Sequence, residues 1–264
     1  TTTEPPTDVR PTTTEVPERG PRPTIDIAVP STSAAPLQKP QRPRSGVDPA
    51  AVADVYNILL LGGDAGPGRS GLRTDTMMIL SVHTPSGRAS LVSLPRDMRG
   101  LLFPPGSALE ARYPYGFTEL ANAVYPIVSA NAGLRSAYES DADIRPGVVA
   151  AAQAIGYSLD LPIHDYVLID MQGFIDLIDA LGGVTVRVTK TIPMPGNVPG
   201  AKHDYPPTIG PGVVDMDGTT ALGYVRSRYA DSDFQRTRRQ RELLAALAQQ
   251  VSIGDVIGRF NDVT

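Results

Sequence analysis

The order of apolar and polar positions predicts an alternation of strands and helices along most of the chain. Apolar runs at residues 56–61 and 76–82 are continuous and end at glycine or polar positions, as buried strands do. A third run at residues 89–94 follows a Pro-Ser-Gly turn at residues 85–87. The short turn predicts an antiparallel hairpin of the second and third strands.

The rest of the chain mixes helical and strand patterns. The spacing of apolar residues predicts helices at residues 118–130, 146–157, 172–181, 217–225 and 235–251, and strands at 163–169 and 184–188. We interpret residues 131–145 as a polar surface loop, and residues 192–212, with six prolines and four glycines, as an irregular loop. The alternation favours an α/β or α+β fold, with a mixed central β-sheet sandwiched by helices.

Composition separates the first fifty residues from the rest. Eleven of the 26 prolines and nine threonines lie there, without apolar periodicity. Such a segment cannot bury enough apolar surface to offset the entropy of ordering it. We therefore expect a disordered linker at residues 1–50 and a single domain at residues 51–264.

Charge and cysteine content exclude several classes of function. The formal net charge of −4 argues against a nucleic-acid-binding surface. The absence of cysteine excludes disulfides, thiolate metal sites and cysteine nucleophiles. No run of about 18 apolar residues predicts a transmembrane helix in this chain. The three histidines are scattered, and no hydrolase signature is present.

Acidic and basic residues accumulate where the first three predicted strands begin or end. Adjacent strands lie about 4.8 Å apart, so five side chains can meet at one sheet edge. They are Asp64, Arg73, Asp75, Arg96 and Asp97. Two carboxylates there suit Mg²⁺, which prefers oxygen ligands, and the arginines suit phosphates. Alternatively, each residue is an ordinary loop charge, with Arg96 paired to Asp75 or Asp97. The glycine-rich residues 64–71 lack the ending of a nucleotide-binding loop.

A second group lies at residues 226–241, which hold six arginines and two aspartates. On the last predicted helix, Arg236, Gln240, Leu243, Leu247 and Val251 fall on one stripe, polar first and then apolar. A helix N-terminus favours phosphate, so the stripe suits a lipid pyrophosphate, with its tail along the apolar residues. We expect an apolar cleft there, with the helices of residues 118–157 as the opposite walls. The alternative is a solvated basic face over an ordinary amphipathic helix.

Five segments of the chain, taken in order, resemble the LytR-CpsA-Psr family of cell-wall glycopolymer phosphotransferases, of actinobacterial type. They are NILLLGGD at residues 57–64, RTDTMMILSV at 73–82, SLPRD at 93–97, HDYVLIDMQGFIDLIDALGGVTV at 164–186 and MDGTTALGYVRSRYADSDFQRTRRQ at 216–240. The resemblance covers residues 55–250. It departs from the family at Thr74, where serine is usual, and at residues 131–145, which look like an insertion.

The resemblance implies an extracytoplasmic enzyme that transfers a glycan from a polyprenyl-pyrophosphate carrier to a peptidoglycan acceptor. It implies anchoring in the cell membrane through a segment missing from this chain. By position, Asp64 and Asp75 look like the ligands of Mg²⁺ or Mn²⁺. The residues that look like pyrophosphate binders are Arg73, Arg96, Arg226, Arg228, Arg236 and Gln240.

Such a reaction is phosphoryl transfer, in which positioning and charge neutralisation do most of the work. We expect Asp75, Arg73, Arg96 and Asp97 to act in catalysis. Asp97 is the candidate general base, with Asp75 and Asp64 as alternatives. The sequence leaves teichoic acid, capsule, arabinogalactan and glycosylated protein open as products, and a composition rich in proline and alanine favours arabinogalactan among them. The competing hypotheses are a lipid pyrophosphate phosphatase, an activity that the transferase would also show to a lesser extent, and a non-catalytic module that binds lipid-linked glycan.

Overall fold

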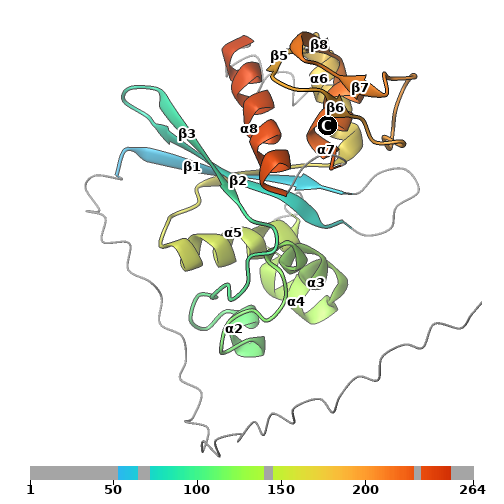
Figure 1. The fold of residues 1–264 in the computed structure, drawn as a ribbon. Coiled ribbons are helices and arrows are strands. Elements are labelled where there is room, and N and C mark those ends of the chain that lie inside the picture. Colours follow the sequence, from blue (N-terminus) through green and yellow to red (C-terminus); the bar gives the residue numbers. More distant parts are fainter. Residues whose placement is uncertain (1–52, 65–71, 140–144, 229–232, 251–264) are drawn as a thin grey trace, which may run out of the picture. The chain divides into compact units, whose positions relative to one another are not determined.

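A computed structural model describes residues 53–64, 72–139, 145–228 and 233–250 (Figure 1). All of them belong to one compact unit, Gln38–Thr264. The linker expected at residues 1–50 and the glycine-rich residues 65–71 lie outside the described residues.

The strands are β1 (Val55–Gly63), β2 (Thr74–His83), β3 (Arg88–Leu94), β4 (Asp165–Ile169), β5 (Val184–Val188), β6 (Ile192–Pro193), β7 (Thr208–Ile209) and β8 (Gly212–Met216). The helices are α2 (Ala108–Arg112), the 3₁₀ helix η1 (Ala121–Ala123), α3 (Val124–Ala130), α4 (Ala132–Tyr138), α5 (Pro146–Leu159), α6 (Met171–Ala180), α7 (Gly218–Arg226) and α8 (Asp233–Gln250).

The central sheet is mixed, as the sequence predicts. Its strand order is β3-β2-β1-β4. The predicted hairpin of β2 and β3 is antiparallel, β1 also runs antiparallel to β2, and β1 pairs with β4 in parallel. The parallel pair is possible because the helices α2 to α5 lie between β3 and β4 in the chain and provide the crossover.

Helices cover both faces of this sheet (Figure 1). Alternate residues of a strand point to opposite faces, and Leu59, Leu61, Met77 and Ile79 all join one buried core with helices α2 to α5. On the other face, α8 lies against the sheet. The predicted sandwich of a mixed sheet between helices is therefore confirmed.

A second core lies beside the sheet and is formed by α6, α7, α8 and two small sheets. Strand β5, which the sequence correctly predicts, pairs antiparallel with β8 rather than joining the central sheet. Strands β6 and β7 form the other pair. Buried and exposed residues alternate along β5, which is the pattern of a sheet that packs one face on a core.

Two of the expected loops contain regular structure. The loop predicted at residues 131–145 is wrong over residues 132–138, which form α4, and residues 140–144 lie outside the described residues. The helix begins after Asn131, whose side chain accepts a hydrogen bond from the backbone N–H of Leu134 at 3.0 Å. Leu134 and Tyr138 then bury one face of α4 in the first core. Within residues 192–212, β6 and β7 form a short ladder, so this segment is less irregular than its composition indicates. The helix expected at residues 118–130 begins only at Ala121.

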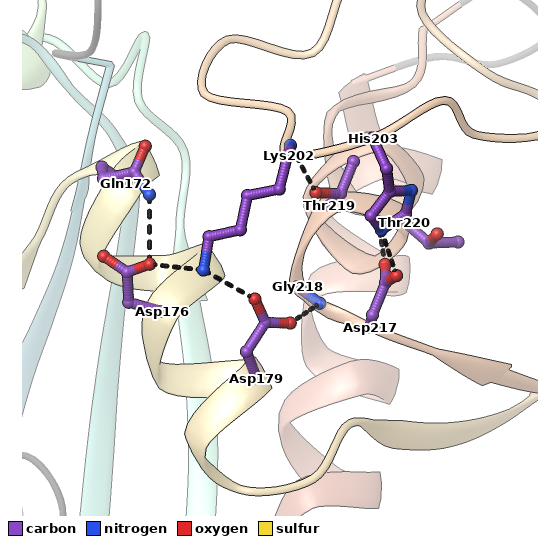
Figure 2. A network of polar contacts seen from close by, with 9 residues as sticks. All are labelled: Gln172, Asp176, Asp179, Lys202, His203, Asp217, Gly218, Thr219 and Thr220. Atoms are coloured by element: carbon purple, nitrogen blue, oxygen red, sulfur yellow. Dashed lines mark hydrogen bonds and ion pairs between the residues drawn. The ribbon is translucent and has the colours of Figure 1, made fainter.

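A network of ion pairs fastens the segment between β6 and β7 to α6 and α7 (Figure 2). The Nζ of Lys202 lies 2.9 Å from a carboxylate oxygen of Asp176 and 2.9 Å from one of Asp179. The other oxygen of Asp179 accepts the backbone N–H of Gly218 at 2.7 Å, in the first turn of α7. The proline-rich segment is thereby held in a defined place on the second core.

Candidate active site at one end of the central sheet

The charged residues predicted at one sheet edge do lie at one end of the central sheet. The register pairs Gly63 with Thr74 and Met77 with Leu94, so β1 and β3 end where β2 begins. The end of β4 lies there too, because Ile169 pairs with Gly62. The residues that flank these strand ends, Asp64, Arg73, Asp75, Arg96 and Asp97, therefore share one edge.

Asp75 is the centre of this group. Its Oδ2 lies 2.8 Å from Nη1 of Arg96 and 4.0 Å from Nη2 of Arg228. Its Oδ1 accepts a hydrogen bond from the Nδ2 of Asn122 at 2.8 Å. Three segments that are far apart in the sequence thus meet at one half-buried carboxylate.

Asp64 and Asp75 are connected by backbone hydrogen bonds to Arg73. The N–H groups of Asp64 and Asp75 both donate to the carbonyl of Arg73 at 3.0 Å. The backbone N–H of Arg73 in turn donates to Oδ1 of Asp64 at 2.6 Å. The two aspartates therefore flank one carbonyl group, with the exposed side chain of Arg73 between them in the sequence.

The alternation of side chains along β2 explains which elements reach this edge. Asp75 shares its face with Met77 and meets Asn122, which comes from the helical layer of the first core. Thr76 points to the other face, where its Oγ1 accepts from the Nε2 of Gln240 at 3.0 Å. Residues 236 and 240 lie one turn apart on α8, so this contact brings the buried Arg236 to the same end of the sheet.

Two polar residues of this region escaped the sequence analysis. Arg239 is only 4% exposed and donates from Nε to the carbonyl of Tyr224 and from Nη2 to that of Ser227. These bonds tie α8 to the end of α7, where Arg226 and Arg228 lie. The other is Asn122, in η1. No signal in the sequence distinguishes either of them, because Arg239 is one arginine among six and Asn122 stands in an alanine-rich segment.

The structure also bears on the alternative interpretations. The ion pair between Arg96 and Asp75 exists, as the reading in terms of ordinary loop charges expects. The same carboxylate is nevertheless approached by Arg228 from a remote part of the chain, which that reading does not predict. Asp97 is exposed at this edge, and its role as a base stays a prediction.

The residues expected to bind a lipid tail are part of the second core. Leu243 and Leu247 are buried with side chains of α6 and α7, and Val251 lies outside the described residues. The expectation that the helices of residues 118–157 face them is wrong, because these helices pack on the opposite face of the sheet. Neither of two hollows on the described surface, of about 530 Å³ beside α5 and about 210 Å³ beside α8, is lined by Leu243 or Leu247. Tail binding by these residues stays a prediction.

The donor set at this edge fits a hard cation only in part. The described residues contain no cluster of three or more histidine, aspartate or glutamate side chains that could enclose a metal ion. Asp64 and Asp75 nevertheless offer carboxylate oxygens, and their backbone N–H groups share the carbonyl of Arg73. Mg²⁺ typically takes one or two carboxylates and completes its shell with waters and phosphate oxygens. The two aspartates therefore suit an ion that is held together with a phosphorylated substrate.

The profile of the LytR_cpsA_psr family matches residues 26–264 of this chain. The chain belongs to this family. The match starts well before residue 55, where the resemblance of individual motifs begins. No helix in the described part of this family member is long and apolar enough to cross a membrane.

Curated relatives agree with this assignment. Biofilm regulatory protein A of Streptococcus mutans is 27% identical over 225 residues, which are 83% of this chain and 50% of the relative. The polyisoprenyl-teichoic acid–peptidoglycan teichoic acid transferase TagU of Oceanobacillus iheyensis is 28% identical over 80% of this chain and 56% of its own length. The chain thus spans about half the length of these relatives.

Solved structures share the fold. The crystal structure of TagV from Bacillus subtilis aligns with a TM-score of 0.55 and 23% identity, covering 79% of this chain and 70% of that one. The structure described as TagT bound to LIIa-WTA aligns with a TM-score of 0.52 and 24% identity, covering 80% and 75%. At this level of identity the likeness supports the fold alone.

Proposed function

We propose that this LytR_cpsA_psr domain transfers a glycopolymer from a polyprenyl-pyrophosphate carrier to peptidoglycan. The observation that carries the proposal is the meeting of Asp75, Arg96 and Arg228 at one end of the sheet, with Asp64 and Arg73 beside them. Guanidinium groups around a carboxylate suit a pyrophosphate that is neutralised partly by arginine and partly by a metal ion. The names of TagU and its relatives describe a transfer of this kind.

The metal belongs to the same proposal. Asp64 and Asp75 would hold Mg²⁺ or Mn²⁺, and the ion would supply charge neutralisation for the phosphate oxygens. Arg96 and Arg228, which already reach Asp75, would bind the phosphates, together with Arg73, Arg226, Arg236 and Gln240. The arginines orient the pyrophosphate so that its glycan-proximal phosphorus faces the acceptor.

The proposed reaction needs one bond to form and one to break. The oxygen of a peptidoglycan hydroxyl attacks the glycan-proximal phosphorus, and the bond from that phosphorus to the oxygen of the lipid-proximal phosphate breaks. Lipid monophosphate leaves with the electron pair, and the arginines stabilise the charge on its oxygens. We assign the hydroxyl proton to the carboxylate of Asp97, which is exposed at this edge, with Asp75 and Asp64 as the alternative acceptors.

The location follows from the substrate. A polyprenyl carrier presents its glycan at the outer face of the cell membrane, so we propose that the domain works there, anchored in the membrane. We propose arabinogalactan as the glycan, on composition, and teichoic acid is the substrate that the names of the TagU relatives give. Donors of both kinds therefore belong in the assay.

The test is turnover of a lipid-pyrophosphate-linked glycan by the protein, with and without peptidoglycan acceptor. We expect transfer that requires the acceptor, stops in excess chelator and returns with Mg²⁺. Asp75→Asn should abolish it, whereas Asp165→Asn, at the opposite end of the same sheet, should not. Glycan release into water without acceptor would favour a lipid pyrophosphate phosphatase. Binding without any turnover would favour a module that presents the lipid-linked glycan.

A further inference from the structure

Asn122 connects two parts of the candidate site. It lies in η1 and is only 3% exposed. Its backbone N–H donates to the carbonyl of Arg96 at 3.2 Å, and the neighbouring Ala121 N–H donates to the carbonyl of Met98 at 2.8 Å. The backbone of η1 is thereby fixed to the segment that follows β3 and carries Arg96.

The side chain of Asn122 completes the support of Asp75. Its Nδ2 donates to Oδ1 of Asp75 at 2.8 Å, while Arg96 takes Oδ2 at 2.8 Å. With one donor on each oxygen, the plane of the carboxylate is fixed. A carboxylate oxygen accepts about two hydrogen bonds or ligands, so each oxygen keeps capacity for one more partner. Asn122 gives this support without adding a further positive charge beside Oδ1, the oxygen that Arg96 does not contact.

The other end of the same amide indicates that packing is not the reason for this side chain. The Oδ1 of Asn122 is buried and has no hydrogen-bond partner within the described residues. A buried acceptor that stays unpaired destabilises the folded state, and an apolar side chain of the same size would avoid that. The reverse orientation of the amide would place its oxygen against the carboxylate of Asp75, which is less favourable still.

We infer that Asn122 is a positioning residue for Asp75 in the transfer reaction. The inference rests on the proposed function, since it assumes that Asp75 acts on the metal ion and the pyrophosphate. Asn122 would touch neither of them. It would hold the carboxylate in the orientation in which its remaining lone pairs face the ligand, as hydrogen-bonded neighbours of metal ligands do.

The chain offers a matched control in Asn57. This asparagine is 1% exposed, its Nδ2 donates to the carbonyl of Pro162 at 2.9 Å, and its Oδ1 is also buried without a partner among the described residues. It lies in β1, six residues before the strand ends at Gly63, and so away from Asp75. Asn57 and Asn122 thus share burial and hydrogen-bond count and differ in which group they hold.

The experiment compares Asn122→Leu with Asn57→Leu in the whole chain. We expect kcat for glycan transfer to fall about 10- to 100-fold in Asn122→Leu, with little change in KM for the lipid donor, because the arginines still bind it. We expect the affinity for Mn²⁺, measured by electron paramagnetic resonance with inorganic pyrophosphate present, to fall by a similar factor. Asn57→Leu should keep both values, whatever its melting temperature.

The outcomes separate this inference from the proposed function. Equal kcat and equal Mn²⁺ affinity in the two variants would overturn the role of Asn122. Absence of transfer by the unaltered protein would overturn the proposed function, while the Mn²⁺ affinities would still decide whether Asn122 positions Asp75. If Asn122→Leu does not fold, Asn122→Ala, which adds no volume, takes its place in the same comparison.

Discussion

Two ionic clusters of this domain are built in opposite ways. At the end of the central sheet, one carboxylate, Asp75, is approached by two guanidinium groups, those of Arg96 and Arg228. On the second core, one ammonium group, that of Lys202, lies between two carboxylates, those of Asp176 and Asp179 (Figure 2). The first grouping carries a net positive charge and the second a net negative charge.

The second cluster has the properties of a structural ion-pair network. The hydrogen bonds that Lys202 donates to the carboxylate of Asp176 and then to that of Asp179 raise the pKa of Lys202 to about 12. The hydrogen bond to Lys202 in turn lowers the pKa of Asp176. Both effects favour the charged forms, so the cluster is complete without a ligand and serves to hold a loop on α6 and α7.

The first cluster is different because its cations come from several elements and converge on a partly exposed carboxylate. Like charges repel at close range, so this arrangement gains most when an anion binds among them. The comparison teaches that an ion pair does not by itself reveal its purpose. Two properties distinguish a structural ion pair from a candidate anion site. They are the sign of the charge in excess and the number of elements that supply the groups carrying it.

The largest effect that separates the clusters should come from Arg228→Ala. We expect turnover to fall on the order of 100- to 1,000-fold, as when a donor to developing charge is removed. Stability should change little, because Arg228 is half exposed and its distance to Asp75 is long. Arg228→Lys should restore activity only in part, since it keeps the charge without the two-pronged geometry.

The control for that variant is Arg238→Ala. Arg238 lies on α8, is similarly exposed and pairs with Glu242 one turn later. Kinetics and melting curves of both variants check the prediction. Equal losses of turnover in the two would mean that Arg228 contributes only to the general field of the protein.

A smaller effect, on stability alone, should follow from Lys202→Met. The Lys202 side chain is 45% exposed, so solvent screens its ion pairs, and we expect the free energy of unfolding to fall by about 1 kcal/mol or less. Urea unfolding measures this change, and the transfer assay should give unchanged kcat. Loss of kcat at unchanged stability would show that the loop takes part in the reaction.

The smallest effect should be a dependence of stability on pH through His203. Its hydrogen bond to the carbonyl of Asp204, and then the carboxylate of Asp217, raise the pKa of His203 above 6.5. The folded state therefore binds the proton more tightly, and this contribution is complete below about pH 6.5 and is lost as the pH rises through the folded value. The melting temperature of His203→Gln, relative to the unaltered protein, should be lower at about pH 5.5 and similar at about pH 8.5. A larger difference at the higher pH would contradict this sign.

The central sheet and its charged edge were predictable because they depend on local signals. Continuous apolar runs mark β1 and β2, and a charge directly after a strand must lie at the end of that strand. Asp75 and Arg96 could be placed together on this basis. The hairpin turn between β2 and β3 fixed the direction of the strands and therefore the shared edge.

The rest depends on contacts between remote segments. Asn122 reaches Asp75 only because η1 packs at the end of β2, and Arg239 is buried only because α7 and α8 meet. The helix α4 was missed because it is short, contains a glycine, and has only two large apolar residues, Leu134 and Tyr138. The opposite walls of a lipid cleft were misplaced because the spacing of apolar residues does not reveal which face of the sheet a helix covers.

The most direct test of the charged edge as a pyrophosphate site is thermal melting with a polyprenyl pyrophosphate and Mg²⁺. A ligand that binds only the folded state raises the melting temperature, by an amount set by its concentration relative to Kd. We predict a rise for the unaltered protein and for Arg238→Ala, and little or none for Arg228→Ala. The same rise in all three proteins, or none in any of them, would contradict the assignment of this edge as the pyrophosphate site.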